Sequence, residues 1–159
     1  MFVAYVSQGY YGLSLALRKP FSPTFGLGHS PALMSVYIKL TGDTSLLEET
    51  YTARNVSDGW DDDYYWSTMI TWFANDVGFS GALLVLGLIG LLWGRSWYAA
   101  TYGLDDRAAI IFCLITFMMF YFPLNNQVFM TFDGYMTFVI WSLYWLFFRG
   151  NRPQPRPTW

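Results

Sequence analysis

Residues 77 to 94 read VGFSGALLVLGLIGLLWG, and no charged side chain interrupts this stretch. A helix needs about 20 mainly apolar residues to cross the hydrocarbon core of a bilayer. Residues 108–124 (AAIIFCLITFMMFYFPL) have the same character, as do residues 127–148, in which Asp133 is the one charged side chain. These patterns predict an all-α, polytopic membrane protein with three transmembrane helices.

The composition of the whole chain agrees with a membrane protein. Of its 159 residues, 54% are hydrophobic and 21% aromatic, and only 13% are charged, whereas soluble domains carry about 25% charged residues. The formal net charge is −2 and there is no basic stripe, which argues against a nucleic-acid partner. Cys113 is the only cysteine, so no disulfide can form within the chain.

The connections between the three apolar stretches predict how they pair. PLNNQ, residues 123–127, combines proline with asparagines and predicts a tight turn, so the second and third spans should form an antiparallel hairpin. RSWYAATYGLDDR, residues 95–107, is expected to form the loop between the first and second spans.

The positions of lysine and arginine predict the orientation, because positively charged loops stay in the cytoplasm. The arginine-bearing loop 95–107 and the tail 149–159 would then be cytoplasmic, while residues 1–66 carry three more acidic than basic side chains and would lie outside. The chain divides accordingly into an outer region (1–66), a membrane domain (67–148) and a cytoplasmic tail (149–159).

The outer region is expected to contain short helices. Residues 1–17 are uncharged, and Arg18 and Lys19 follow them. A signal peptide carries its positive charge before the apolar region, so we interpret residues 1–17 as a helix lying on the membrane surface. PALMSVYIKLTG predicts an amphipathic helix ended by Gly42, with another beginning after Thr44 as its N-cap. This start is unlike that of a polytopic protein, which suggests a fragment whose earlier spans are missing.

Five stretches of the sequence carry a resemblance to a known family. They read YVSQGYYGLSLAL (5–17), PTFGLGHSPAL (23–33), YTARNVSDGW (51–60), STMITWFANDVGFSGALL (67–84) and FPLNNQVF (122–129). With them, nearly the whole chain resembles the C-terminal part of a bacterial O-antigen or capsule repeat-unit polymerase of the Wzy type. The resemblance implies a GT-C-type glycosyltransferase of the bacterial inner membrane, in which residues 1–66 would be a periplasmic loop region. Such an enzyme transfers a glycan from undecaprenyl pyrophosphate onto the next lipid-linked repeat unit, without a metal or other cofactor.

The partners implied are the lipid-linked glycan, membrane lipid and other polysaccharide-assembly proteins. Two alternatives stay open. An O-antigen ligase differs from a polymerase only in its acceptor, and a non-enzymatic membrane subunit could use the outer loop to bind a partner.

The chemistry of this transfer selects candidate residues. A pyrophosphate leaving group needs fixed cations, and Arg54 could supply one; an acceptor hydroxyl needs a base, for which His29 and Asp58 are candidates. The alternatives are that Arg54 merely pairs with Asp58 at helical spacing and that His29 is a solvated loop residue.

Further residues are candidates for binding substrate. Trp60, Tyr64 and Tyr65 could receive sugar rings, or could instead form the aromatic belt of a span. Arg18 and Lys19 could attract phosphate, or anchor the N-terminal helix at the headgroups.

Acidic residues near the spans have two interpretations. Asp76 and Asp133 are expected to face a polar cavity under the outer loop, near Asn75 and Asn126, or to make structural contacts between helices. The run 61–63 could hold a divalent cation, but we interpret it as an outer acidic cluster and expect no metal site.

Overall fold

The computed structural model describes residues 2–61 and 64–148, and every regular element within these ranges is helical. The α-helices are α1 (Phe2–Ala16), α2 (Pro31–Thr41), α3 (Ser45–Glu48), α4 (Tyr51–Asn55), α5 (Met69–Tyr102), α6 (Asp106–Tyr121) and α7 (Phe132–Phe147). Two short 3-10 helices, η1 (Val56–Asp58) and η2 (Gln127–Phe129), follow α4 and precede α7. The expected all-α class is confirmed.

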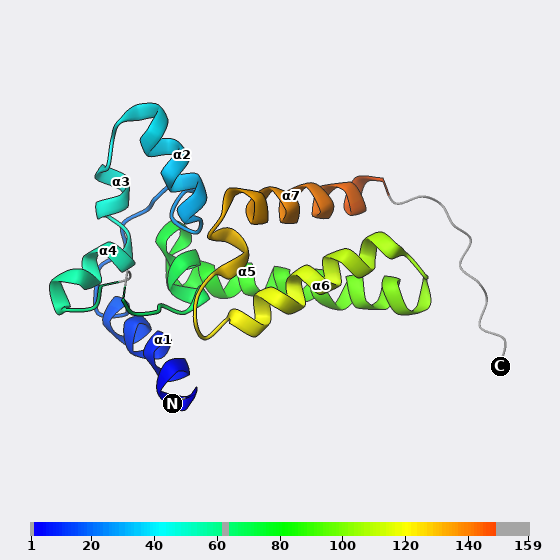
Figure 1. Ribbon diagram of the computed structural model, residues 1–159, viewed down its shortest axis with the longest axis horizontal. Helices are drawn as coiled ribbons and strands as arrows, with labels where there is room; N and C mark the ends of the chain where they lie inside the picture. Colours follow the sequence, from blue (N-terminus) through cyan, green and yellow to red (C-terminus); the bar gives the residue numbers. More distant parts are fainter. Residues whose placement is uncertain (1, 62–63, 149–159) are drawn as a thin grey trace.

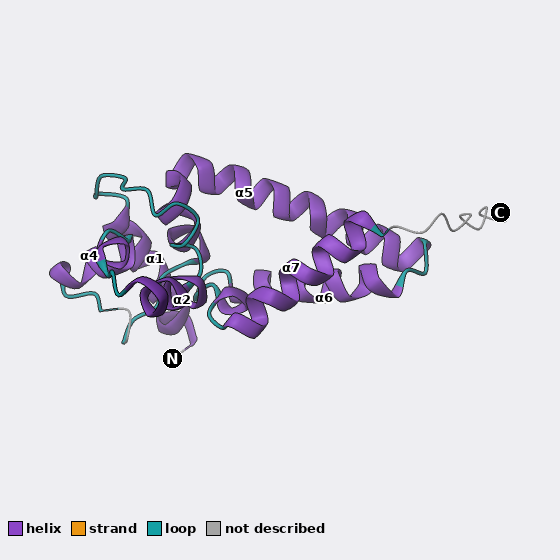
Figure 2. Ribbon diagram, turned by 90° about the horizontal axis from the view of Figure 1, so that it is seen from above, coloured by secondary structure: helices purple, strands orange, loops and turns teal. Residues whose placement is uncertain are grey.

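The helices form two parts that differ in shape (Figure 1). Helices α5, α6 and α7 run side by side, and α1 to α4 gather at one end of them, around the first turns of α5. The view from above shows the same division, with the chain leaving α7 at the opposite end (Figure 2). Helix α6 runs antiparallel to α5 and α7, so the predicted hairpin of the second and third apolar stretches is confirmed.

Helix α5 is broken near its start. It is 34 residues long, and Gly78 within it has φ 69° and ψ 173°. This backbone conformation is essentially restricted to glycine because a Cβ would clash there. The break lets residues 69–77 turn under the loops of the N-terminal part, while residues 79–102 continue as the long apolar arm.

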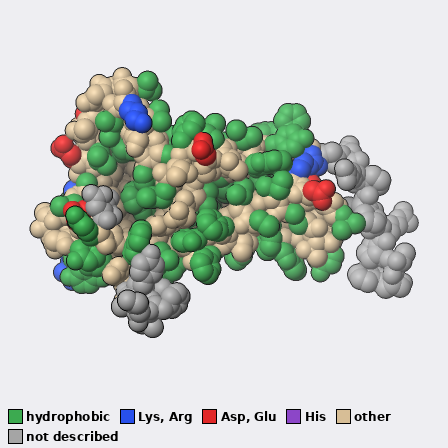
Figure 3. Space-filling model, viewed as in Figure 1, with side chains coloured by type: hydrophobic (Ala, Val, Ile, Leu, Met, Phe, Trp, Pro, Cys, Tyr) green, Lys and Arg blue, Asp and Glu red, His purple; other side chains and the backbone are tan. Residues whose placement is uncertain are grey.

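The long arm of α5 exposes apolar side chains. Leu83, Leu84, Leu88 and Leu91 are each more than 60% exposed. With a mean hydropathy of 2.0 in its most apolar window, α5 alone among the described helices is long and apolar enough to cross a membrane. On the face visible in Figure 3, hydrophobic side chains are spread over the part of the molecule that α5, α6 and α7 form.

Helices α5 and α6 pack through small and branched side chains. Ala82, Ile89 and Ala99 of α5 belong to the same buried cluster as Ile111 and Ile115 of α6. Small residues let two helix backbones approach closely, which is how membrane helices gain packing contacts. A hydrogen bond between the indole Nε1 of Trp93 and the Thr116 hydroxyl, 3.0 Å, also joins the pair.

The predicted bounds of the loop between the first and second apolar stretches, residues 95–107, were wrong. Helix α5 continues to Tyr102, so Arg95 is helical and only residues 103–105 connect it to α6. The turn is short because Asp105 caps α6, accepting from the backbone N–H of Arg107 at 3.1 Å.

The predicted start of the third apolar helix was also wrong. Residues 127–129 form η2, and α7 begins at Phe132 because the Thr131 side chain caps it, accepting from Gly134 N at 3.2 Å. Helices α6 and α7 are 16 residues each, shorter than the predicted spans.

The predicted end of α2 at Gly42 was correct, but the predicted capping by Thr44 was not, because its side chain makes no capping hydrogen bond and donates to Glu48 instead. Gly42 ends α2 in a left-handed conformation, with φ 73°, and donates its N–H to Ile38 O at 2.8 Å. Ser30 caps the start of α2, directly before Pro31, and Thr44 precedes α3. The cap at Ser30 fixes the end of the loop of residues 24–30, in which His29 lies.

Candidate active site

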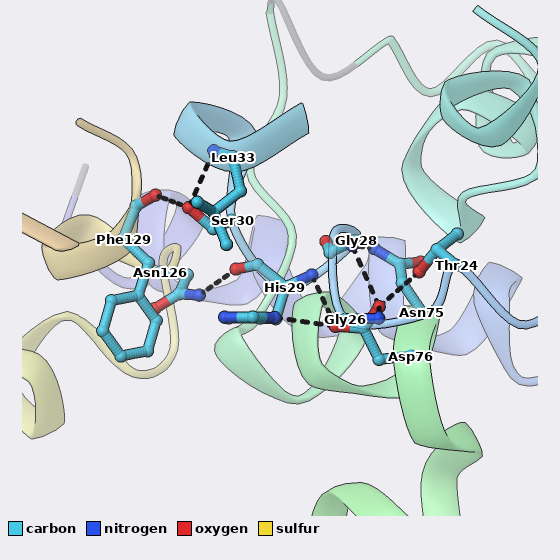
Figure 4. Close-up of polar contacts among 10 residues, drawn as sticks. All are labelled: Thr24, Gly26, Gly28, His29, Ser30, Leu33, Asn75, Asp76, Asn126 and Phe129. Atoms are coloured by element: carbon cyan, nitrogen blue, oxygen red, sulfur yellow. Dashed lines mark hydrogen bonds and ion pairs between the residues drawn. The ribbon is translucent and has the colours of Figure 1, made fainter. Parts of the chain in front are cut away.

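The loop of residues 24–30 is folded around one carboxylate (Figure 4). Oδ1 of Asp76 accepts from the Thr24 hydroxyl at 2.6 Å and from the backbone N–H groups of Gly26 and Gly28 at 2.8 and 3.0 Å. Oδ2 accepts from the backbone N–H of His29 at 3.0 Å and from its ring Nδ1 at 2.7 Å. Five hydrogen bonds to one carboxylate make Asp76 the organising residue of this loop.

The His29 ring is held on three further sides by aromatic rings. Its centroid lies 6.0 Å from that of Phe73 in a stacked arrangement, 5.6 Å from that of Phe129 and 5.8 Å from that of Tyr135. Its side chain keeps only 18% of its accessible surface, and that of Asp76 only 9%. The interpretation of His29 as a solvated loop residue was therefore wrong.

Two buried asparagines fasten this loop to distant segments. Asn75 donates to Gly28 O at 2.9 Å and accepts from Tyr51 N at 2.8 Å, which ties the loop to α4. Asn126 donates to His29 O at 2.6 Å, and both asparagine side chains are fully buried. The predicted proximity of Asp76 to Asn75 and Asn126 thus corresponds to contacts through the loop.

The geometry gives the histidine a defined chemistry. Because Asp76 accepts from Nδ1, the neutral ring carries its proton there and its lone pair on Nε2. Within the described residues Nε2 has no hydrogen-bond partner, and the Oδ1 atom of Asn126 is buried without one. A carboxylate on one ring nitrogen and a free lone pair on the other is the arrangement of an oriented general base.

Arg54 does not pair with Asp58, as one interpretation expected. Its Nη1 donates to Pro20 O at 3.0 Å and its Nε to Thr50 O at 3.4 Å. Its guanidinium carbon lies 4.9 Å from the centre of the Tyr51 ring. Nη2 is buried and has no hydrogen-bond partner among the described residues.

Arg18 and Lys19, which follow α1, differ in their contacts. The Lys19 Nζ lies 2.7 Å from a carboxylate oxygen of Asp58 and donates to the carbonyl of Arg54, so it closes the end of α4. Arg18 is exposed. The structure thus places Asp58 in an ion pair at the surface, in contact with Lys19 and not with the His29 ring.

The three aromatic candidates differ in how much of each ring is exposed. The ring of Trp60 stacks on Tyr65 with centroids 4.2 Å apart and lies 4.8 Å from that of Tyr11, so neighbouring rings cover much of it. Its Nε1 donates to Trp66 O at 3.3 Å. Tyr64 is 78% exposed and is the most accessible of the three candidate rings.

Asp133 does not face a polar cavity. Because α7 starts at Phe132, Asp133 lies in the first turn of the helix and is exposed. An acidic side chain is favourable there because it complements the positive end of the helix dipole. Asp62, Asp63 and the tail 149–159 lie outside the described residues.

Comparison with family models, with curated proteins and with solved structures found no match. The function must therefore be argued from the residues and their geometry.

The sequence indicated His29 and Asp76 separately but not as a pair. They are 47 residues apart, and nothing local to either predicts their contact. Thr24, Gly26 and Gly28 were missed as groups that hold Asp76. The signal that could have found them is the small-residue run around the only histidine, because a tightly wound loop supplies backbone N–H groups to an anion.

Proposed function

We propose that this chain acts as a membrane glycosyltransferase that polymerises undecaprenyl-pyrophosphate-linked oligosaccharide repeat units into O-antigen or capsular polysaccharide. The observation that carries the proposal is the His29–Asp76 pair, built where three of the stretches that resemble such polymerases meet: the loop 23–33, the start of α5 and the turn 122–129.

In this proposal His29 is the general base. The acceptor hydroxyl passes its proton to Nε2 while its oxygen forms a bond to the anomeric carbon of the donor sugar. The bond between that carbon and the pyrophosphate oxygen breaks, and the pyrophosphate leaves on its lipid with the electron pair. Asp76 keeps the ring oriented and stabilises the positive charge that the ring gains.

For the leaving group we propose Arg54. Two carbonyl oxygens hold its guanidinium, and Nη2 is buried without a partner among the described residues, so it must become accessible before a phosphate oxygen can bind it. The Tyr51 ring beneath it lies 5.1 Å from that of Phe79, the residue that follows the break in α5. Arg54 would thus stand where the apolar arm begins, at the depth at which a lipid-linked pyrophosphate leaves the bilayer.

The membrane arrangement is part of the proposal. Helix α5 from residue 79 onward is about 36 Å long at 1.5 Å per residue, more than the roughly 30 Å of a hydrocarbon core. Helices α6 and α7 pack beside it, contain no charged side chain after Arg107 and Asp133 respectively, and expose Phe117, Phe120, Ile140 and Leu143. Although α5 alone among the described helices has the length of a span, we propose that the shorter α6 and α7 cross the inner membrane beside it, with α1 to α4 in the periplasm and the C-terminus in the cytoplasm.

Topology reporters test this placement. A reporter active only in the periplasm should be active after Gly42 and inactive after Trp159, and a cytoplasmic reporter should show the reverse. The turn after α5 supplies an internal check, because a fusion at Gly103 should behave like one at Trp159. A cytoplasmic Gly42 with a periplasmic Trp159 would contradict the orientation.

Removing the gene from its host tests the function. A polymerase predicts loss of long-chain polymer while single repeat units still reach the cell surface, with restoration by the intact gene. Loss of surface glycan of every length would instead indicate a ligase. Unchanged polymer would refute both enzymes and favour the non-enzymatic subunit.

A further inference from the structure

Phe25, in the loop that carries His29, is held in an exposed position. Its side chain is 79% exposed, and its backbone has a φ of 52°. A positive φ is uncommon for a bulky residue because the Cβ crowds the backbone. The residues on both sides hold Phe25 there, since the Thr24 hydroxyl and the Gly26 N–H both donate to Oδ1 of Asp76 (Figure 4). The loop therefore presents an aromatic ring to its surroundings and not to the protein core.

Two further apolar side chains lie at the same short segment of α5. A Cβ built on Gly78 would meet the ring of Phe21 at 3.7 Å, so this ring lies over the break in α5. Val77 directly precedes the break, and Phe21 and Val77 are each about half exposed. Phe25 is joined to this segment through Asp76. We call Phe21, Phe25 and Val77 the loop patch.

The loop patch borders the long apolar arm of α5. Leu83 and Leu84, within two turns of the break, are well exposed, and no charged side chain occurs from residue 77 to residue 94. Among the described helices, α5 is the one that is long and apolar enough to cross a membrane. Exposed apolar surface marks a site of contact with a protein or a membrane. Because the loop patch lies where this arm begins, its position favours the bilayer as the partner.

We propose that the loop patch inserts into the outer leaflet of the bilayer, with Phe25 reaching the acyl chains. Removing an aromatic ring from water is favourable, which offsets the strain of the positive φ. The inference rests on the membrane crossing of α5 in the proposed function, but its test does not require glycosyl transfer. Because Thr24 and Gly26 join Phe25 to Asp76, the contact holds the loop of His29 at the membrane surface, where the pyrophosphate of a lipid-linked substrate lies.

Spin labels measure the depth of the loop patch. Cys113→Ser removes the only cysteine, and Phe25→Cys, Leu84→Cys or Leu40→Cys then supplies a single labelling site. The protein is placed in liposomes of phosphatidylethanolamine and phosphatidylglycerol, and collisions of each label with oxygen and with a water-soluble nickel chelate are compared. Leu40, 81% exposed at the end of α2, is the matched control outside the loop patch. The labels at residues 25 and 84 should collide mainly with oxygen, and the label at residue 40 mainly with the nickel chelate.

Cross-linking to lipid tests the same contact without a label on the protein. A phospholipid with a photoactivatable group in its acyl chain should cross-link to residues 20–26 and to residues 83–91 of the wild type. Glycine adopts a φ of 52° without strain, so Phe25→Gly should keep the circular dichroism spectrum and the unfolding temperature of the wild type or raise the latter. It should lose most cross-links to residues 20–26 and keep those to residues 83–91.

The outcomes separate the contact from the proposed function. A label at residue 25 that collides mainly with the nickel chelate, while the label at residue 84 lies in lipid, would overturn the contact. Lipid cross-links confined to residues 83–91 of the wild type would do the same and would leave another polypeptide as the partner. If residue 25 lies in lipid but the purified protein extends no chain, the contact stands and glycosyl transfer is refuted. Chain extension with residue 25 in water refutes only the contact.

Discussion

Replacing His29 with glutamine should remove nearly all long-chain polymer from cells while the protein still inserts into the membrane. Glutamine keeps a polar side chain of moderate size and can donate to Asp76, but it offers no basic nitrogen. A positioned general base accelerates proton transfer by about 10²- to 10⁴-fold. The measurement is the chain-length distribution of surface polymer, normalised to the amount of membrane-inserted protein.

Two further variants serve as a control and as a second test of the site. Asp133→Asn alters an exposed carboxylate in the first turn of α7 and should leave polymer length and yield normal. Asp76→Asn should abolish polymer as well, because an amide N–H₂ would face N–H donors that now bond to the carboxylate. Normal polymer from a well-inserted His29→Gln protein would show that His29 is not the base.

Replacing Gly78 with alanine should have an effect of similar size through the fold. The φ of 69° and ψ of 173° at this position exclude a Cβ without strain of order 1–3 kcal/mol. Helix α5 would relax by straightening through residue 78, which would move Asn75 and Asp76 away from the loop that they hold. We expect a lower thermal unfolding temperature in detergent, easier proteolysis of residues 20–30 and loss of polymer.

Gly87→Ala is the matched control in the same helix. Gly87 is helical, and a Cβ there would meet no atom within 4 Å. Alanine should therefore be tolerated and should stabilise the helix by up to about 1 kcal/mol. An unfolding temperature and polymer yield equal to wild type for Gly78→Ala would show that the break does not position the site.

Much of the fold could be predicted from local patterns. Uncharged apolar runs indicated the cores of α5, α6 and α7, and Gly42 marked the end of α2. These features could be predicted because apolar runs and helix-ending residues depend only on neighbours in the sequence. The start of α7 was misplaced although its signal was present. Thr131 followed by Asp133 is an N-cap with an acidic first turn, and the apolar run on both sides of it obscured that signal.

The break in α5 could not be predicted from the same patterns. Gly78 lies in VGFSGALL, where glycines read as small residues of a membrane helix. The contacts of Asn75 and Asp76 with the loop of residues 24–30 hold the chain before this break, and these partners are distant in the sequence.

The candidate site was predicted in its components but not in its connections. His29 and Asp76 were both candidates, yet their pairing depends on the tertiary fold that brings the loop over α5. Arg54 and Asp58 are four residues apart and were an obvious pair, but Lys19 reaches Asp58 instead and the arginine turns to Pro20 O. Local spacing could not reveal a competing partner 39 residues away.

The most direct test of the central claim is chain extension by the purified protein. The protein in liposomes would receive undecaprenyl-pyrophosphate-linked repeat units, and the products would be separated by length. The account predicts a ladder of lipid-linked chains from the wild type and, from His29→Gln at equal protein, a rate lower by about two orders of magnitude or more. No extension by a folded wild-type protein, or equal ladders from both proteins, would contradict it.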